Sequence, residues 1–76
     1  MKSEAKATFV ICVQNEDYEA SLETRKVYQR LPDDEAAKHR LLRVVDESGE
    51  DYLYPEAYFV SIDLPASVQE VLLSAA

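Results

Sequence analysis

The sequence of 76 residues contains one cysteine and one histidine, two side chains that can act together as a nucleophile and its base. Cys12 lies inside an apolar run, where burial raises the pKa of a thiol and makes it inert. His39 lies between Lys38 and Arg40, a setting typical of the solvated end of a helix. We therefore expect Cys12 to pack as a small hydrophobic residue, and we expect no catalytic residues.

Metal and phosphate chemistry lacks the residues it requires. A structural zinc site takes four Cys or His ligands, and only Cys12 and His39 are present. The segment 46–51 carries acids and a glycine, but it lacks the ligand spacing of a calcium loop. A chain with a single glycine also has no glycine-rich phosphate-binding loop. The sequence thus predicts no metal, no cofactor and no enzymatic activity.

Tyrosine is the residue type that points to a binding function. The chain has five Tyr, two Phe and no Trp. A tyrosine at a surface offers a flat apolar ring while its hydroxyl stays in water, as binding grooves require. Carboxylates flank several of these tyrosines and suit a partner that carries Arg, Lys or Pro. The predicted binding residues are Tyr18, Tyr52, Tyr54, Pro55 and Tyr58, with the acidic Asp17 and Glu19. The alternative is that Tyr52 and Tyr54 half-cover a small core.

Charge excludes several classes of partner. Fifteen acidic residues against eight basic ones give a net charge of −7, which repels nucleic acids and anionic membrane surfaces. The polar beginning of the sequence and its short apolar runs fit neither a signal peptide nor a membrane span. A single cysteine cannot form an internal disulfide, so we expect a cytoplasmic protein.

Five strands account for the middle of the chain. β-branched and aromatic residues predict strands near 8–14, 26–31, 41–45, 52–54 and 58–62. Residues 18–31 are ambiguous, because spacings typical of a helix overlap with the alternation of 26–31, which favours a strand. Gly49 predicts a tight hairpin turn, since glycine adopts a left-handed conformation at the least cost. Both faces of the first strand are apolar, as in a strand of a small closed barrel.

Two helices and the domain limits complete the predicted organisation. Acids followed by bases predict a short helical turn near 33–39, with Asp33 or Asp34 as its cap. The helical period of Leu64, Val68, Val71 and Leu72 predicts a C-terminal helix over 65–75, docked on the barrel or on a second molecule. Residues 1–7 are expected to be a frayed leader before a single domain over 8–76.

The segment from Glu50 to Ile62 resembles the end of a Src-homology-3 domain. In that family a distal hairpin is followed by an apolar residue, a proline, two residues, a tyrosine and a last strand, places filled here by Tyr54-Pro55, Glu56-Ala57, Tyr58 and Phe59. The resemblance implies a barrel and assigns Pro55 and Tyr58 to a groove. The family's acidic-aromatic opening motif and groove tryptophan are absent, and Ala57 replaces its asparagine. The chain also resembles small stand-alone bacterial proteins of unassigned function that are built on such barrels.

The sequence therefore predicts a mainly β protein, a small five-stranded Src-homology-3-like barrel with two helical segments. The expected function is a non-catalytic interaction module that presents tyrosines and carboxylates to a basic or extended segment of a protein or peptide partner. The alternative is an acidic regulator that occupies the basic surface of a nucleic-acid-binding protein or enzyme. The chain is expected to be a monomer, or a weak homodimer formed through the helix or an open strand edge.

Overall fold

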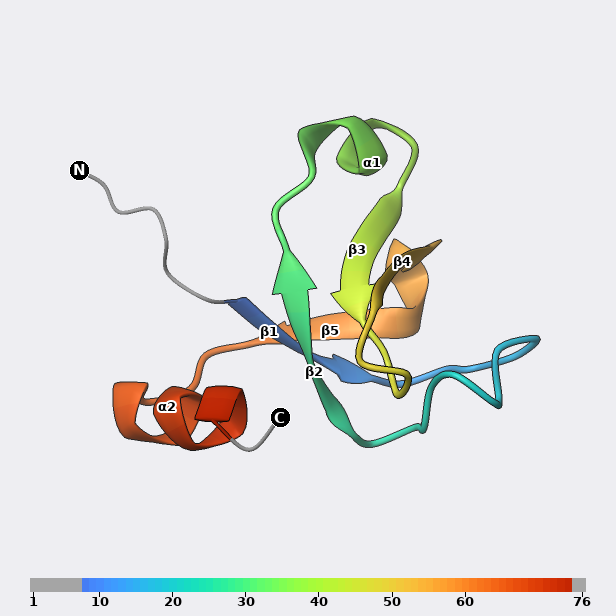
Figure 1. Cartoon of the computed structure of the whole chain (residues 1–76). Helices are drawn as coiled ribbons and strands as arrows, with labels where there is room; N and C mark the ends of the chain where they lie inside the picture. The colour runs from blue at the N-terminus through green and yellow to red at the C-terminus, as the bar shows by residue number, and fades with distance from the viewer. Residues whose placement is uncertain (1–7, 75–76) are drawn as a thin grey trace.

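Five antiparallel strands and two short helices make up the chain in a computed structural model that describes residues 8–74 (Figure 1). This confirms the mainly β prediction, and the expected leader 1–7 lies outside the described residues. The elements are β1 (Thr8–Cys12), β2 (Val27–Leu31), α1 (Asp34–Lys38), β3 (Leu41–Val45), β4 (Asp51–Pro55), the 3-10 helix η1 (Glu56–Tyr58), β5 (Phe59–Ile62) and α2 (Ala66–Ser74).

The strands form one sheet in the order β4-β3-β2-β1-β5. Neighbouring strands are antiparallel throughout, with Val10 opposite Tyr28 and Ser61, and Leu42 opposite Tyr54. β1 and β5 lie across the direction of β2 and β3 in Figure 1, so the sheet is bent. Over residues 8–74 the edge strands β4 and β5 are not paired with each other, so the sheet is open and the predicted closure into a barrel is wrong.

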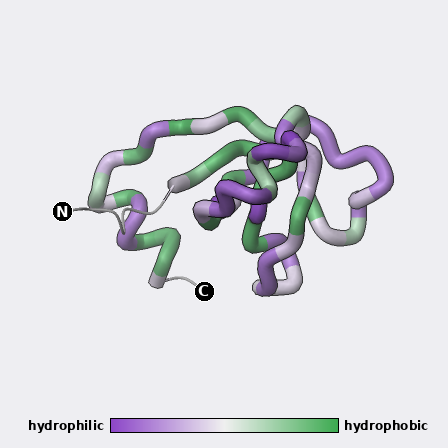
Figure 2. Tube along the Cα trace, turned by 90° about the horizontal axis from the view of Figure 1, so that it is seen from above, coloured by the Kyte–Doolittle hydropathy of each residue, from purple (hydrophilic) through white to green (hydrophobic). Residues whose placement is uncertain are grey.

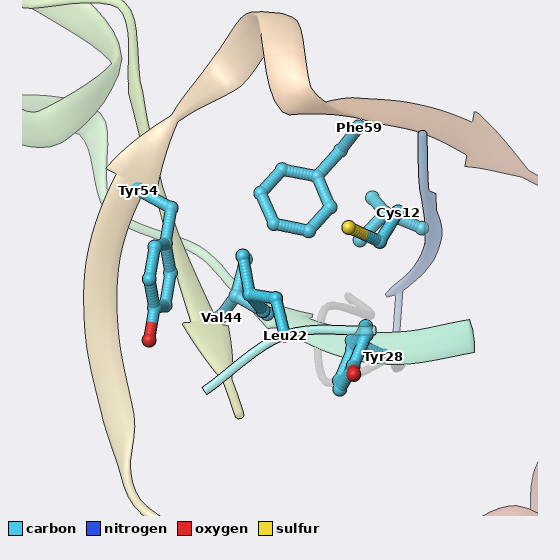
Figure 3. Close-up of a cluster of buried hydrophobic side chains, with 7 residues drawn as sticks. Cys12, Leu22, Tyr28, Val44, Tyr54 and Phe59 are labelled. Carbon is cyan, nitrogen blue, oxygen red and sulfur yellow. The ribbon is translucent and has the colours of Figure 1, made fainter. Parts of the chain in front are cut away.

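The core lies on the inner face of the bent sheet. Its buried side chains come from all five strands and from the loop between β1 and β2: Val10, Cys12, Leu22, Tyr28, Val44, Tyr54 and Phe59 (Figure 3). Val10 and Cys12 alternate with residues of the other face, as the period of two in a strand requires. This cluster holds the two halves of the sheet together, because β4 and β5 contribute Tyr54 and Phe59 to it from opposite edges.

The hairpin turn at Gly49 and the start of helix α1 both form where the sequence predicted them. Gly49 has a φ of 86°, and its amide donates to the carbonyl of Asp46 at 3.0 Å in the β3–β4 turn. Asp33 caps α1, because its carboxylate accepts from the amide of Ala36 at 3.0 Å. The same carboxylate accepts from Arg43 in β3 at 2.7 Å, which ties the helix to the sheet.

The ambiguous stretch 18–31 is part loop and part strand. Residues 27–31 form β2, as the alternation favoured, and residues 18–26 are turns and irregular structure. We call residues 13–26 the β1–β2 loop, which extends away from the sheet on the side opposite α2 (Figure 1). Figure 2 shows that the outer part of this loop is hydrophilic, as expected for a segment exposed to solvent.

The two apolar faces of β1 have a different cause from barrel closure. Phe9 is buried, but it is not a member of the inner core. It lines a hollow on the other face of the sheet together with Val27 of β2 and with Leu72 and Leu73 of α2. The outer face of β1 is therefore apolar because α2 covers part of it.

Candidate binding surface

Four of the five tyrosines form a continuous row of edge-to-face rings. The Tyr52 and Tyr54 ring centroids are 5.3 Å apart, those of Tyr54 and Tyr18 are 5.0 Å apart, and those of Tyr18 and Tyr58 are 6.1 Å apart. These separations and the steep interplanar angles are those that aromatic quadrupoles favour. We call these four residues the tyrosine row. It brings together the predicted residues from the β1–β2 loop, β4 and η1.

The members of the row differ in depth, and this corrects one prediction. Tyr54 is only 1% exposed, and its hydroxyl donates to Asp46 Oδ2 at 2.6 Å, so it is a core residue and not an exposed contact. Tyr52, two residues earlier on the same strand, is 58% exposed. Tyr18 and Tyr58 are half-buried and pack on the core cluster. The exposed part of the row therefore consists of Tyr52, Tyr18 and Tyr58, with Tyr54 beneath them.

Tyr58 is held at the surface by η1 and by the β1–β2 loop. Its hydroxyl donates to the carbonyl of Glu16 at 3.1 Å, and its own carbonyl accepts from the amide of Val13 at 2.8 Å. Pro55 ends β4 and immediately precedes the 3-10 helix η1. Its φ of −58° is close to the value that the proline ring imposes. Of the predicted pair, Pro55 therefore immediately precedes η1 and Tyr58 is its last residue, at one end of the tyrosine row.

Carboxylates of the β1–β2 loop edge the row. Asp17 and Glu19 are exposed, and Asp17 is in the left-handed conformation with a φ of 73°, which aspartate tolerates well. Partial desolvation, followed by the negative charges of Glu16, Asp17 and Glu19, raises the pKa of Tyr58. The same negative field that disfavours a phenolate at this position favours a cation beside the ring.

The β1–β2 loop is fixed by one buried side chain and several hydrogen bonds to its own ends. Leu22 is completely buried in the core, and its carbonyl accepts from Asn15 Nδ2 at 2.9 Å. The amide of Arg25 donates to the carbonyl of Cys12 at 2.7 Å, and the amide of Glu47 donates to the carbonyl of Ser21 at 3.0 Å. Leu22 was not among the residues predicted from the sequence, although it is the only large aliphatic residue between Val13 and Val27.

A second group of polar contacts joins this loop to the β3–β4 turn. The Tyr28 hydroxyl donates to Glu47 Oε2 at 2.5 Å and accepts from the amide of Glu23 at 2.8 Å. Lys26 Nζ lies 2.6 Å from the same Glu47 oxygen. The hydrogen bond from Lys26, and then that from Tyr28, lowers the pKa of Glu47. Glu47 therefore stabilises the attachment of the loop in its ionised form.

This lowered pKa predicts a loss of stability in acid. Because the folded state holds the pKa of Glu47 below its ordinary value of 4.5, its contribution is present above that value and is lost as the pH falls through the folded pKa. We expect the thermal midpoint of Glu47→Gln to fall less than that of wild type between about pH 5 and about pH 3. Glu50→Gln, an exposed position in the same turn, is the control. Parallel curves for wild type and Glu47→Gln would contradict the role given to Glu47.

The net charge is distributed unevenly along the chain. Residues 1–43 contain eight acidic and eight basic residues, whereas residues 44–76 contain seven acidic residues and no Lys, Arg or His. The entire excess of −7 therefore comes from residues 44–76, which include β4, η1, β5 and α2. The seven acids of this part of the chain are Asp46, Glu47, Glu50, Asp51, Glu56, Asp63 and Glu70.

The structure does not bring Cys12 and His39 together as a nucleophile and a base. Cys12 is completely buried, burial raises the pKa of its thiol, and Sγ donates to the carbonyl of Gln14 at 3.2 Å. His39 is exposed at the end of α1, where Nε2 lies 3.9 Å from a Glu35 carboxylate oxygen. The two side chains therefore have separate partners in separate environments.

Residues 8–74 contain neither a cluster of metal ligands nor a membrane-spanning helix. Within that range no three His, Cys, Asp or Glu side chains lie together as metal ligands would. None of the helices formed by the described residues has the length and apolar character needed to cross a membrane. No protein-family model, no curated protein and no solved structure matches this chain.

Proposed function

We propose that the chain is a non-catalytic interaction module that binds a basic or extended segment of a partner protein on the exposed part of the tyrosine row. The observation that carries this proposal is the contact between the half-buried rings of Tyr18 and Tyr58 beside the carboxylates of Asp17 and Glu19, with the exposed Tyr52 joined to them through the ring of Tyr54. The rings provide apolar area for an extended chain, and the carboxylates provide partners for Arg or Lys. We place this activity in the cytoplasm, on the ground of the single cysteine.

The proposal includes a Src-homology-3-like fold. The strand order β4-β3-β2-β1-β5 and the 3-10 helix between the last two strands support it. The long β1–β2 loop supplies Tyr18 and the acids, and η1 supplies Tyr58 next to Pro55. On this hypothesis Pro55 and Tyr58 form one end of the groove, and the absent tryptophan leaves the other end to Tyr52.

The test is an NMR titration of the ¹⁵N-labelled chain with a ten-residue proline-rich peptide that contains one arginine. We expect amide shifts at residues 16–19 and 56–58, and a weaker response to the same peptide with glutamate in place of arginine. Tyr58→Ala is expected to weaken binding about tenfold, equivalent to about 1.4 kcal/mol, while the chain stays folded. Shifts confined to other residues, or an identical response to both peptides, would refute the proposed site.

Two carboxylate variants distinguish the effect on binding of the acids beside the tyrosine row from the effect of the net charge of the chain. Glu19→Gln and Glu35→Gln each remove one exposed negative charge, the first beside the tyrosine row and the second on α1. We expect only Glu19→Gln to weaken the peptide complex at physiological salt, because screened charges more than about 10 Å apart contribute little.

A second candidate function is an acidic regulator that occupies the basic surface of a nucleic-acid-binding protein or enzyme. The concentration of the whole excess charge in residues 44–76 favours it. Binding of this kind falls steeply with salt, whereas binding by the tyrosine row retains much of its affinity. Equal weakening by Glu19→Gln and Glu35→Gln in the titration would favour this alternative.

A further inference from the structure

The C-terminal helix α2 has an apolar surface that the sheet does not cover. None of its residues is buried, and Val68, Val71, Leu72 and Leu73 are exposed by 40%, 65%, 40% and 45%. Val68, Val71 and Leu72 are spaced by three and four residues, so they form one stripe along the helix. Leu72 and Leu73 also line the hollow against Phe9, which shows that the stripe begins at the sheet and continues onto the free side of the helix.

Two hollows lie next to each other beside α2. A cavity of about 180 Å³ lies between Leu72 and Leu73 of α2 and the side chains of Phe9 and Val27. A second, of about 470 Å³, lies between Leu72 and the β3–β4 turn. Tyr28, Val45 and Leu72 line both hollows, so the two are neighbours. We call these two hollows, together with the stripe of Val68, Val71 and Leu72, the α2 trough.

The charge around the α2 trough is negative. Glu70 is a residue of α2, Asp63 lies three residues before the helix begins, and Asp46 and Glu47 line the end of the trough formed by the β3–β4 turn. The one base among its lining residues, Lys26, is already paired with Glu47 at 2.6 Å. An apolar trough with an acidic border complements a segment that is apolar on one side and basic on the other.

We propose that the α2 trough binds a basic amphipathic helix of a partner protein, at a site separate from the tyrosine row. A ridge of side chains spaced by three and four residues matches the corresponding spacing on a facing helix. α2 has nine residues and is about 13 Å long, so the contact spans two to three turns of the partner. A second copy of the chain is a poorer occupant, because it brings a second set of uncompensated acids to the same surface.

The test uses two fluorescein-labelled 14-residue peptides of Leu and Lys with the same composition. One peptide has leucines at helical spacing, and the other has them scrambled. We expect the intact chain to bind the first at least tenfold more tightly, as measured by fluorescence anisotropy at about 0.15 M salt. Equal affinities would overturn the proposal, because charge alone would then explain the binding.

Variants of the chain identify the trough as the site. Replacing both Val68 and Val71 by Gln is expected to weaken binding of the helical peptide at least fivefold, with an unchanged circular-dichroism spectrum. Val13→Gln is the control, because it makes the same chemical change at a valine that is 52% exposed and lines neither hollow. Val13 directly follows the last residue of β1. Glu70→Gln is expected to weaken binding at about 0.05 M salt and to have little effect at about 0.5 M. An unchanged affinity in the Val68/Val71 variant overturns the proposal.

Two further measurements separate this proposal from its competitors. Tyr58→Ala is expected to leave binding of the helical peptide unchanged, so this site and the tyrosine row succeed or fail independently. Sedimentation equilibrium of the chain alone is expected to give a monomer. A dimer that dissociates on replacement of Val68 and Val71 would show that a second copy occupies the trough, and the proposal would be wrong.

Discussion

Tyr54→Ala is expected to lower the free energy of unfolding by about 3–5 kcal/mol, since it removes a fully buried aromatic ring from the centre of a small core. A chain of this length is expected to have about 4–11 kcal/mol of stability in total, so the variant loses much or all of it. Urea denaturation followed by circular dichroism measures the change. The ring contacts Tyr18, Tyr52 and Phe59, and the cavity left behind would loosen each of them.

Tyr52→Ala is the matched control for this experiment. It deletes the same side chain from the same strand face two residues away, where the ring is largely exposed, and it is expected to cost about 1 kcal/mol or less. Tyr54→Phe keeps the ring and removes only the hydroxyl that donates to Asp46, with an expected cost of about 1–2 kcal/mol. Equal destabilisation by the two alanine variants would show that Tyr54 has no special role in the core.

The contrast between Tyr52 and Tyr54 shows what a strand pattern leaves open. A period of two places both residues on one face, and the structure agrees. How deep each one lies depends on the bend of the sheet and on the loop that brings Tyr18 and Leu22 onto Tyr54. These contacts join residues more than 30 positions apart, and no local pattern encodes them. The four tyrosines of the row could therefore be predicted from the sequence, whereas the burial of Tyr54 could not.

Features with a local cause were predicted well. The turn at Gly49 depends on the backbone preference of a single glycine. The cap at Asp33 depends on a side chain that accepts a hydrogen bond from the amide three residues later in the chain. The period of α2 predicted a helix, observed at Ala66–Ser74 within the expected range 65–75. How far other elements cover its apolar stripe depends on packing between residues distant in the sequence. In the structure the sheet covers the stripe only in part.

Leu22→Ala is expected to have the second largest effect on stability, about 2–5 kcal/mol, although Leu22 lies in a loop. Its side chain is the only one of the β1–β2 loop among the buried core residues of the described chain, so it fixes the loop against the sheet. The loop carries Tyr18 and the acids of the proposed binding surface. Loss of Leu22 is therefore expected to weaken peptide binding as well, through a loop that no longer holds Tyr18 beside Tyr58.

Leu73→Ala provides the same chemical deletion at an exposed position of α2, and we expect it to cost about 1 kcal/mol or less. Hydrogen exchange measured in Leu22→Ala under conditions where it is still folded separates loop release from global unfolding. We expect faster exchange at the amide of Arg25, which donates to Cys12 across the base of the loop, before the amides of β1 and β2 respond. If the loop and strand amides accelerate together, Leu22 supports the whole core equally, and the binding surface has no separate anchor.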